Sequence, residues 1–114
     1  MKYFKLEEFD DLPGTGKNMK KEFLLKLEKA REIAGIPFII NSGFRTKETN
    51  RRVGGSPNSS HLKGVAADIS CKNSSDRIVI VRSLIEAGFN RIGVADTFIH
   101  VDLDNDKINA LWLY

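Results

Sequence analysis

Apolar residues follow two different spacings along this 114-residue chain. Between Phe23 and Ile33 they recur every three to four positions, which is the period of a helix with one buried face. From Phe98 to Leu103 the pattern has a period of two, which is typical of a strand with one apolar face. A helix early in the chain and strands late in it predict an α+β domain.

The chain length and the turn residues extend this prediction to a complete fold. Because 114 residues provide for one core only, residues 1–114 are expected to form a single domain. Helices are expected over 19–34, 46–53 and 74–85, and strands over 37–40, 64–69, 91–94, 98–103 and 108–113. The expected N-caps are Asn18, Thr46 and either Ser74 or Ser75. The last three strands are expected to form an antiparallel meander, in a sheet that carries helices on one side.

Composition excludes several classes of protein. Charged residues make up 29% of the chain without any low-complexity segment, so a folded domain is expected. The net charge of +3 includes a basic cluster at Lys17, Lys20 and Lys21, which we interpret as solvated helix surface. Such a cluster would also suit an acidic cell-wall polymer, and no nucleic-acid partner is expected. The single cysteine, Cys71, cannot form an internal disulfide.

The only two histidines of the chain lie close to other residues that bind metals. His61 is followed seven positions later by Asp68, and small residues beside the aspartate leave room for a metal and a substrate. On the strand predicted at 98–103, the period of two places His100 on the same face as Asp102. Two imidazoles and one carboxylate are a common zinc ligand set, and three protein ligands leave a fourth position for water. Catalytic zinc sites have this open position, whereas structural sites are closed.

Zinc at such a site would favour hydrolysis. The ion lowers the pKa of its bound water to ~7 and polarises a carbonyl group, so cleavage of a peptide bond is the reaction expected. The alternative is that His61 is a simple loop residue and that His100 is a hydrogen-bonded histidine at the side of a sheet.

Three segments, in this order, resemble the zinc D-Ala-D-Ala carboxypeptidases and their relatives, among them vancomycin-resistance dipeptidases, phage endolysins and proteins of the Hedgehog-like fold. The segments are Ser42-Gly43-Phe44-Arg45, the Ser-x-His-x-x-Gly-x-Ala-x-Asp pattern that ends at Asp68, and Phe98-Ile99-His100-Val101-Asp102. With the segment from Phe4 to Lys17, the resemblance covers nearly the whole chain and is nearest to the short, phage- or prophage-borne branch. It implies a Hedgehog-like fold and zinc bound by His61, Asp68 and His100.

The resemblance also implies roles for two residues near the ligands. Arg45 matches the arginine of the family's Ser-Gly-Tyr/Phe-Arg motif, and would stabilise negative charge on the reacting carbonyl or hold a substrate carboxylate. A surface salt bridge is the alternative for this side chain. Ser59 is a candidate donor of a hydrogen bond to the substrate, and a role in a turn is the alternative.

The general base is the point at which this sequence departs from the family. Relatives carry an acid three residues before the last histidine ligand, or a second histidine two residues before it, and here these positions are Thr97 and Phe98. Asp102 is our first candidate to accept a proton from the water, and Asp96 is the second. Asp102 is equally suited to orient a ligand imidazole.

These observations predict a zinc metallopeptidase that cleaves amide bonds in peptidoglycan stem peptides, as a D,D-carboxypeptidase or as an endolysin-like endopeptidase. The alternatives are a non-catalytic, zinc-stabilised module of a cell-wall-binding or phage structural protein, and a zinc-free binder of anionic polymers. No apolar run approaches the ~18 residues of a membrane span, and residues 1–8 lack the apolar core of a signal peptide. We therefore expect a monomer that is made in the bacterial cytoplasm and acts on the cell wall after release.

Overall fold

The computed structural model describes residues 1–114 as one α+β domain, which confirms the predicted fold class. The helices are α1 (Lys21–Ala34), α2 (Lys47–Arg52) and α3 (Ser74–Glu86), and three 3₁₀ turns are η1 (Leu6–Phe9), η2 (Thr15–Asn18) and η3 (Ser60–Lys63). The strands are β1 (Ile40–Ser42), β2 (Ala66–Ser70), β3 (Arg91–Val94), β4 (Phe98–Asp102) and β5 (Ala110–Leu113). They form one sheet in the order β1-β2-β4-β3-β5. No helix has the length and apolar character needed to cross a membrane.

The sheet is antiparallel except at the edge formed by β5. Strands β3 and β4 form the expected antiparallel pair, but β5 runs parallel to β3, so the prediction of an antiparallel meander is wrong for the last strand. The reason lies in residues 103–109, which carry the chain past the start of β3 to its far side. Strand β5 therefore pairs with the outer edge of β3 and runs parallel to it, whereas a meander would pair it with β4.

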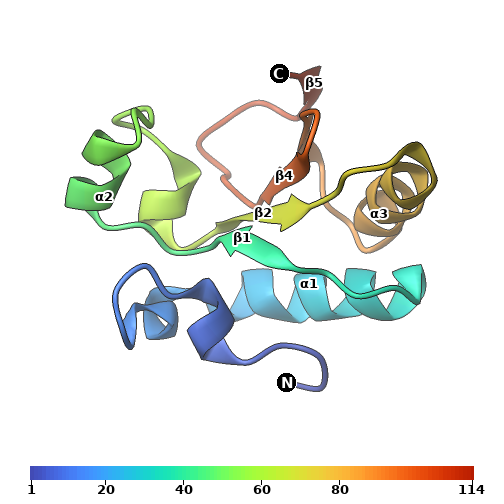
Figure 1. Ribbon diagram of the computed structural model, residues 1–114, viewed down its shortest axis with the longest axis horizontal. Coiled ribbons are helices and arrows are strands. Elements are labelled where there is room, and N and C mark those ends of the chain that lie inside the picture. The colour runs from blue at the N-terminus through green and yellow to red at the C-terminus, as the bar shows by residue number, and fades with distance from the viewer.

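The two faces of the sheet have different environments. Ile69, Ile99 and Val101 are fully buried in the core, which α1 and α3 complete on this side of the sheet. Figure 1 shows α1 running along one side of the strands, with α3 next to it and α2 at the opposite end of the molecule. The other face carries Asp68 and His100, so the predicted separation of polar and apolar sides is confirmed for β4.

The ends of the helices differ in part from the prediction. Asn18 does not cap α1, because it belongs to η2, and α1 begins after Lys20. Thr46 caps α2 as predicted, since its side chain accepts a hydrogen bond from the backbone N–H of Thr49. The cap of α3 is Asn73 instead of either serine, because its Oδ1 accepts from the N–H of Asp76 at 2.8 Å.

The first strand begins later than predicted. Residues 37–39 precede β1, and β1 itself covers Ile40–Ser42. Proline at position 37 has no N–H to donate to a neighbouring strand, which explains why pairing starts further along. Phe38 nevertheless packs into the core, so this apolar segment is buried without being a strand.

The N-terminal segment supports the loop between β1 and α2. Phe9 packs so closely on Gly43 that a Cβ at position 43 would lie 2.6 Å from the Cβ of Phe9. The Asp11 carboxylate accepts from the N–H of Thr46 at 2.7 Å and from the hydroxyl groups of Thr46 and Thr49 at 2.9 and 2.8 Å. The start of the chain is therefore bound to the segment that carries Arg45.

We expect Asp11→Ala to lower the free energy of unfolding by about 1–2 kcal/mol at neutral pH, since three donors lose their acceptor. Although burial opposes ionisation, the hydrogen bonds from Thr46 and Thr49 hold the pKa of Asp11 below its usual value. The stabilisation is thus present above the unfolded pKa of about 3.9 and is lost as the pH falls through the lower folded pKa. Urea unfolding over this pH range measures both effects, with exposed Glu86→Ala as the control. Equal losses for the two variants at pH 7 would contradict the assignment.

Candidate metal centre

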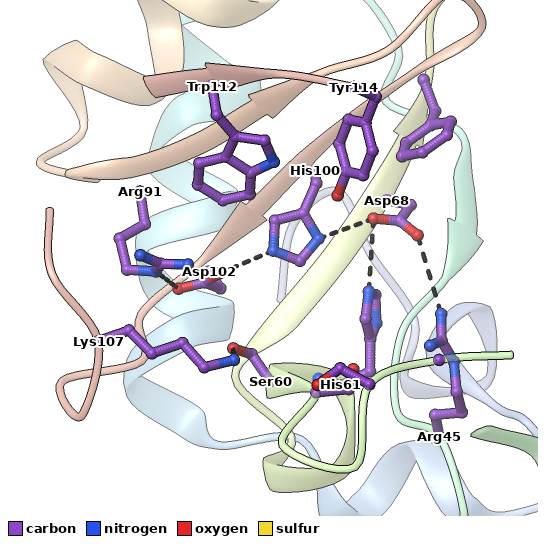
Figure 2. Close-up of a pocket in the computed structure, with 14 residues that line it drawn as sticks. Arg45, Ser60, His61, Asp68, Arg91, His100, Asp102, Lys107, Trp112 and Tyr114 are labelled. Atoms are coloured by element: carbon purple, nitrogen blue, oxygen red, sulfur yellow. Dashed lines mark hydrogen bonds and ion pairs between the residues drawn. The ribbon is translucent and has the colours of Figure 1, made fainter. Parts of the chain in front are cut away.

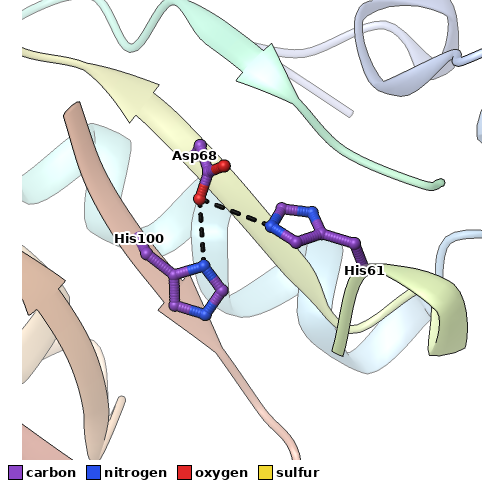
Figure 3. Close-up of side chains that lie close together, drawn as sticks. All are labelled: His61, Asp68 and His100. Carbon is purple, nitrogen blue, oxygen red and sulfur yellow. Dashed lines mark hydrogen bonds and ion pairs between the residues drawn. The ribbon is translucent and has the colours of Figure 1, made fainter. Parts of the chain in front are cut away.

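His61, Asp68 and His100 converge at one point on the open face of the sheet (Figure 3). Asp68 on β2 is paired directly with His100 on β4, and its Oδ1 lies 2.9 Å from His100 Nδ1. The same oxygen lies 3.4 Å from Nε2 of His61, which η3 contributes. One potential ligand atom from each residue lies within 4.8 Å of the other two. The three residues predicted as metal ligands are thus brought together by the fold.

The position of His61 depends on a tightly held 3₁₀ turn. The Oγ of Ser59 accepts a hydrogen bond from the N–H of His61 at 3.3 Å and caps η3. The turn ends at Gly64, which has a positive φ of 72°. A Cβ there would also lie 2.2 Å from the carbonyl oxygen of Asn18, so position 64 requires glycine for both conformation and space.

Each imidazole is held by a hydrogen bond on the side that faces away from Asp68. His61 Nδ1 lies 2.8 Å from the carbonyl oxygen of Gly43, and His100 Nε2 lies 2.7 Å from Oδ2 of Asp102. Because a carbonyl and an ionised carboxylate only accept hydrogen bonds, these outer nitrogens carry the protons. When a cation replaces the proton on the inner side, the inner nitrogens can present lone pairs to it, beside the Asp68 carboxylate.

The donor set fits a zinc ion. Zinc bonds of about 2.0–2.1 Å in a tetrahedron place neighbouring ligand atoms about 3.3 Å apart. The distances from Asp68 Oδ1 to His100 Nδ1 and His61 Nε2, 2.9 and 3.4 Å, lie on either side of this value. The nitrogen–oxygen ligand chemistry and the partners of both imidazoles also match those of zinc sites. His61, Asp68 and His100 therefore could hold a metal ion of this kind.

The charges of the site are consistent with cation binding. Although burial opposes ionisation, hydrogen bonds from His100 and His61 hold the pKa of Asp68 well below its usual range. Burial lowers the pKa of His100, but its hydrogen bonds to Asp102 and Asp68 outweigh this and raise the pKa overall. The ionised carboxylate thus attracts a proton to His100, and a metal ion would compete with that proton.

A pocket with a volume of about 370 Å³ opens over the three residues (Figure 2). This volume is at the lower end of the range for small-molecule sites, about 300–1,000 Å³. The lining residues are Arg45, Gly55, Ser56, Ser59, Ser60, His61, Asp68, Arg91, Phe98, His100, Asp102, Lys107, Trp112 and Tyr114. A bound metal would therefore be accessible to a ligand in this pocket.

Comparison with known families agrees with this geometry. Residues 3–102 match the family model described as peptidase M15. The chain belongs to the peptidase M15 family. Membership implies a metallopeptidase, and the His-Asp-His cluster gives this M15 domain a suitable metal site. No protein in the curated set matches the chain. Strand β5 follows the matched residues.

Asp102 of this M15 domain is buried and fully engaged. Its side chain is only 1% exposed, and its Oδ1 accepts from Arg91 Nε at 2.7 Å and from the N–H of Asp104 at 3.0 Å. Its Oδ2 contacts His100 Nε2, as described above. Burial opposes ionisation, but these hydrogen bonds lower the pKa of Asp102. Asp96, in contrast, is exposed on the β3–β4 turn and does not line the pocket.

Arg45 reaches the pocket through a contact that the sequence did not indicate. Its Nη1 donates to Oδ1 of Asn50 at 3.0 Å, and its Nη2 donates to Ser42 Oγ at 3.2 Å and lies 4.0 Å from Asp68 Oδ2. Asn50 is 4% exposed and also donates to the carbonyl oxygen of Ser56 at 2.8 Å. At Gly55, a Cβ would lie 2.0 Å from Asn50 Oδ1. Asn50 and Gly55 thus fix Arg45 in the M15 site.

Eight of the lining residues were not predicted as site residues from the sequence: Gly55, Ser56, Ser60, Arg91, Phe98, Lys107, Trp112 and Tyr114. The strand predicted over 108–113 could have indicated Trp112. The period of two places Trp112 on the same face as Ile108, and the next position on that face, just beyond the predicted strand, is Tyr114. Lys107 had no local signal. It donates to Ser60 Oγ at 3.0 Å and to the carbonyl oxygen of Asn58 at 2.7 Å, across a large separation in the sequence.

The convergence of ligand atoms leads us to expect about one tightly bound zinc ion per wild-type chain after loading and dialysis. His61→Ala and Asp68→Ala should each retain little zinc, because only two protein ligands remain. Elemental analysis by mass spectrometry gives the stoichiometry. Asp96→Ala is the control, because this residue lies outside the pocket, and it should bind zinc like wild type. Wild-type zinc content in His61→Ala would overturn the ligand assignment.

Replacing Asp102 should weaken metal binding without removing a ligand. Asp102→Asn keeps the shape of the side chain but not its charge, so we expect about 10- to 100-fold lower zinc affinity. Competition with a chromophoric chelator measures this change. The matched variant is Asp106→Asn, because the Asp106 side chain is 85% exposed and lies two positions beyond Asp104. Unchanged affinity in Asp102→Asn would contradict an orienting role.

Proposed function

We propose that this M15 domain is a zinc metallopeptidase that hydrolyses amide bonds in peptidoglycan stem peptides. The observation that carries the proposal is the convergence of His61, Asp68 and His100 beneath an open pocket. Membership of the peptidase M15 family supports the reaction class. The resemblance of the three sequence motifs to D-Ala-D-Ala carboxypeptidases and endolysins supports the substrate class.

Zinc would be held by His61, Asp68 and His100, and when bound it supplies a Lewis acid that polarises a carbonyl and lowers the pKa of water. The rest of the chemistry belongs to the side chains. Asp102 and the carbonyl of Gly43 hold the two imidazoles in the orientation and tautomer that metal binding needs.

Arg45 is suited to bind the oxygen of the peptide bond that is cleaved. Its guanidinium lies 4.0 Å from Asp68 at the edge of the metal centre, and its side chain is only 15% exposed. A guanidinium held in place by Asn50 and Ser42 stabilises developing negative charge without having to reorganise. Ser59 lines the same pocket, and its hydroxyl can donate to the substrate while its oxygen caps η3.

The contacts of Asp102 favour orientation of His100 over general-base catalysis. Both of its carboxylate oxygens already accept hydrogen bonds, and Asp96 lies outside the pocket. This observation also favours a second candidate function, a metal-stabilised module that binds cell-wall peptides without cleaving them. Hydrolysis by the wild-type protein decides between the two functions.

The substrate could be cut at its end or internally. A D,D-carboxypeptidase would remove a terminal D-alanine, whereas an endopeptidase would open the stem peptide or its cross-link. A short enzyme of the phage or prophage branch, acting as a monomer on the cell wall after release, is consistent with the motifs. A basic surface at Lys17, Lys20 and Lys21 would attract anionic wall polymers.

We expect the zinc-loaded wild type to release fragments from purified peptidoglycan, identified by mass spectrometry, and we expect His61→Ala to release none. The fragment masses name the bond, because loss of a single alanine marks a carboxypeptidase and larger fragments mark an endopeptidase. Leu113→Ala is the control for handling of the protein, since this residue is 81% exposed and lies outside the pocket. A zinc-loaded wild type that binds peptidoglycan but cuts no bond would support the binding module and exclude the peptidase.

A further inference from the structure

Strand β5 contributes aromatic side chains to the pocket although it lies outside the residues matched to the M15 family. Its parallel register pairs Trp112 with Gly93 of β3, and Gly93 is paired with His100 of β4. Trp112 and Tyr114 therefore lie on the face that carries the metal centre, and Leu111 and Leu113 lie on the other face. Figure 2 shows both aromatic rings extending from this edge toward His100.

The indole of Trp112 is held in one place by its neighbours. A Cβ at Gly93 would lie 2.5 Å from Cε2 of the indole, so only glycine leaves room for the ring at this position. The guanidinium of Arg91 lies 4.9 Å from the centre of the indole, and the imidazole of His100 lies 5.5 Å from it. The Asp102 carboxylate fixes Arg91 in turn. Trp112 is thus a rigid wall beside the metal centre.

Tyr114 and Phe98 extend this wall. The ring centres of Phe98 and Tyr114 are 5.1 Å apart, and those of Trp112 and Tyr114 are 6.3 Å apart. Tyr114 is held to the sheet by its N–H, which donates to the carbonyl oxygen of Val94 at 3.0 Å. It remains 67% exposed, whereas the core aromatics Phe23 and Phe89 are at most 1% exposed. A side chain with so little burial contributes little to the core and is accessible to a ligand.

The charged groups at this end of the pocket are already paired. Arg91 is bound to Asp102 and stacks on Trp112, and Lys107 Nζ lies 3.5 Å from Oδ2 of Asp104. A substrate group at this end therefore meets aromatic faces instead of free positive charge. Aromatic faces favour contact with aliphatic groups.

We infer that Trp112 and Tyr114 are specificity-determining residues that hold an aliphatic side chain, such as the methyl group of an alanyl residue, next to the bond to be cleaved. This inference rests on the proposed peptidase function and names the part of the substrate that β5 recognises. A glutamyl residue at the same position is disfavoured, because its negative charge would lie against aromatic rings without a partner.

The test uses a synthetic stem pentapeptide ending in D-Ala-D-Ala and the full zinc-loaded chain. Trp112→Ala and Tyr114→Ala should each raise KM by about tenfold or more with a smaller change in kcat, because a binding contact is lost and the metal ligands remain. Tyr114→Phe should restore most of the affinity, because it retains the aromatic face. Leu113→Ala, on the opposite face of the same strand, should behave like wild type. Zinc content and thermal unfolding establish that each variant is loaded and folded.

A binding measurement separates this inference from the proposed function. Trp112 is the only tryptophan of the chain, so its fluorescence reports peptide binding whether or not a bond is cut. A fluorescence change in wild type and Leu113→Ala that is lost in Tyr114→Ala supports the aromatic wall, even if hydrolysis is absent and the peptidase proposal fails. Hydrolysis by wild type with KM within about twofold in both alanine variants overturns the wall and leaves the peptidase proposal intact. Neither binding nor hydrolysis of the pentapeptide overturns both.

Discussion

The register between β2 and β4 is the constraint on which the metal centre depends. It pairs Asp68 with His100, and the next pair along the strands is Ile69 with Ile99. Both isoleucines are fully buried against the helices. Because side chains alternate between the faces of a strand, a slip of one residue would move His100 into the core and Ile99 into the pocket. The hydrophobic core therefore fixes the alignment of Asp68 and His100, although the side chains of these two residues lie on the opposite face of the sheet.

Asp102 and Asp104, which lie two positions apart at the end of β4 and just beyond it, support the two histidines. Asp102 accepts from His100 Nε2, and Asp104 accepts from Ser60 Oγ at 2.7 Å and Lys63 Nζ at 2.9 Å, on either side of His61 in η3. Both carboxylates are almost completely buried, which is costly for a charge unless it is paired and hydrogen-bonded. Here cationic partners and hydrogen bonds compensate both charges. The two carboxylates thus hold both His100 on β4 and the turn η3 that carries His61.

Local patterns in the sequence predict those features that depend on neighbours in the chain. The alternation around His100 identifies the polar face of β4, and Thr46 identifies the start of α2, because capping and strand periodicity act over a few residues. The position of β5 depends instead on how residues 103–109 cross the start of β3, and no local pattern reports this crossing. The same reason applies to Asn50. Its contact with Arg45 forms only when α2 and the loop after it pack near the end of β1.

A single row of side chains crosses the sheet and joins the parts of the site. Its members, from one edge to the other, are Ser42, Asp68, His100, Gly93 and Trp112. The central members belong to strands paired on both sides, and two of them, Asp68 and His100, are the candidate metal ligands of the sheet. Trp112 lies on an edge strand with one neighbour, and its own strand contributes no metal ligand. Substrate preference can therefore change at β5 while the metal centre is kept, which separates the residues that set specificity from those that hold the ion.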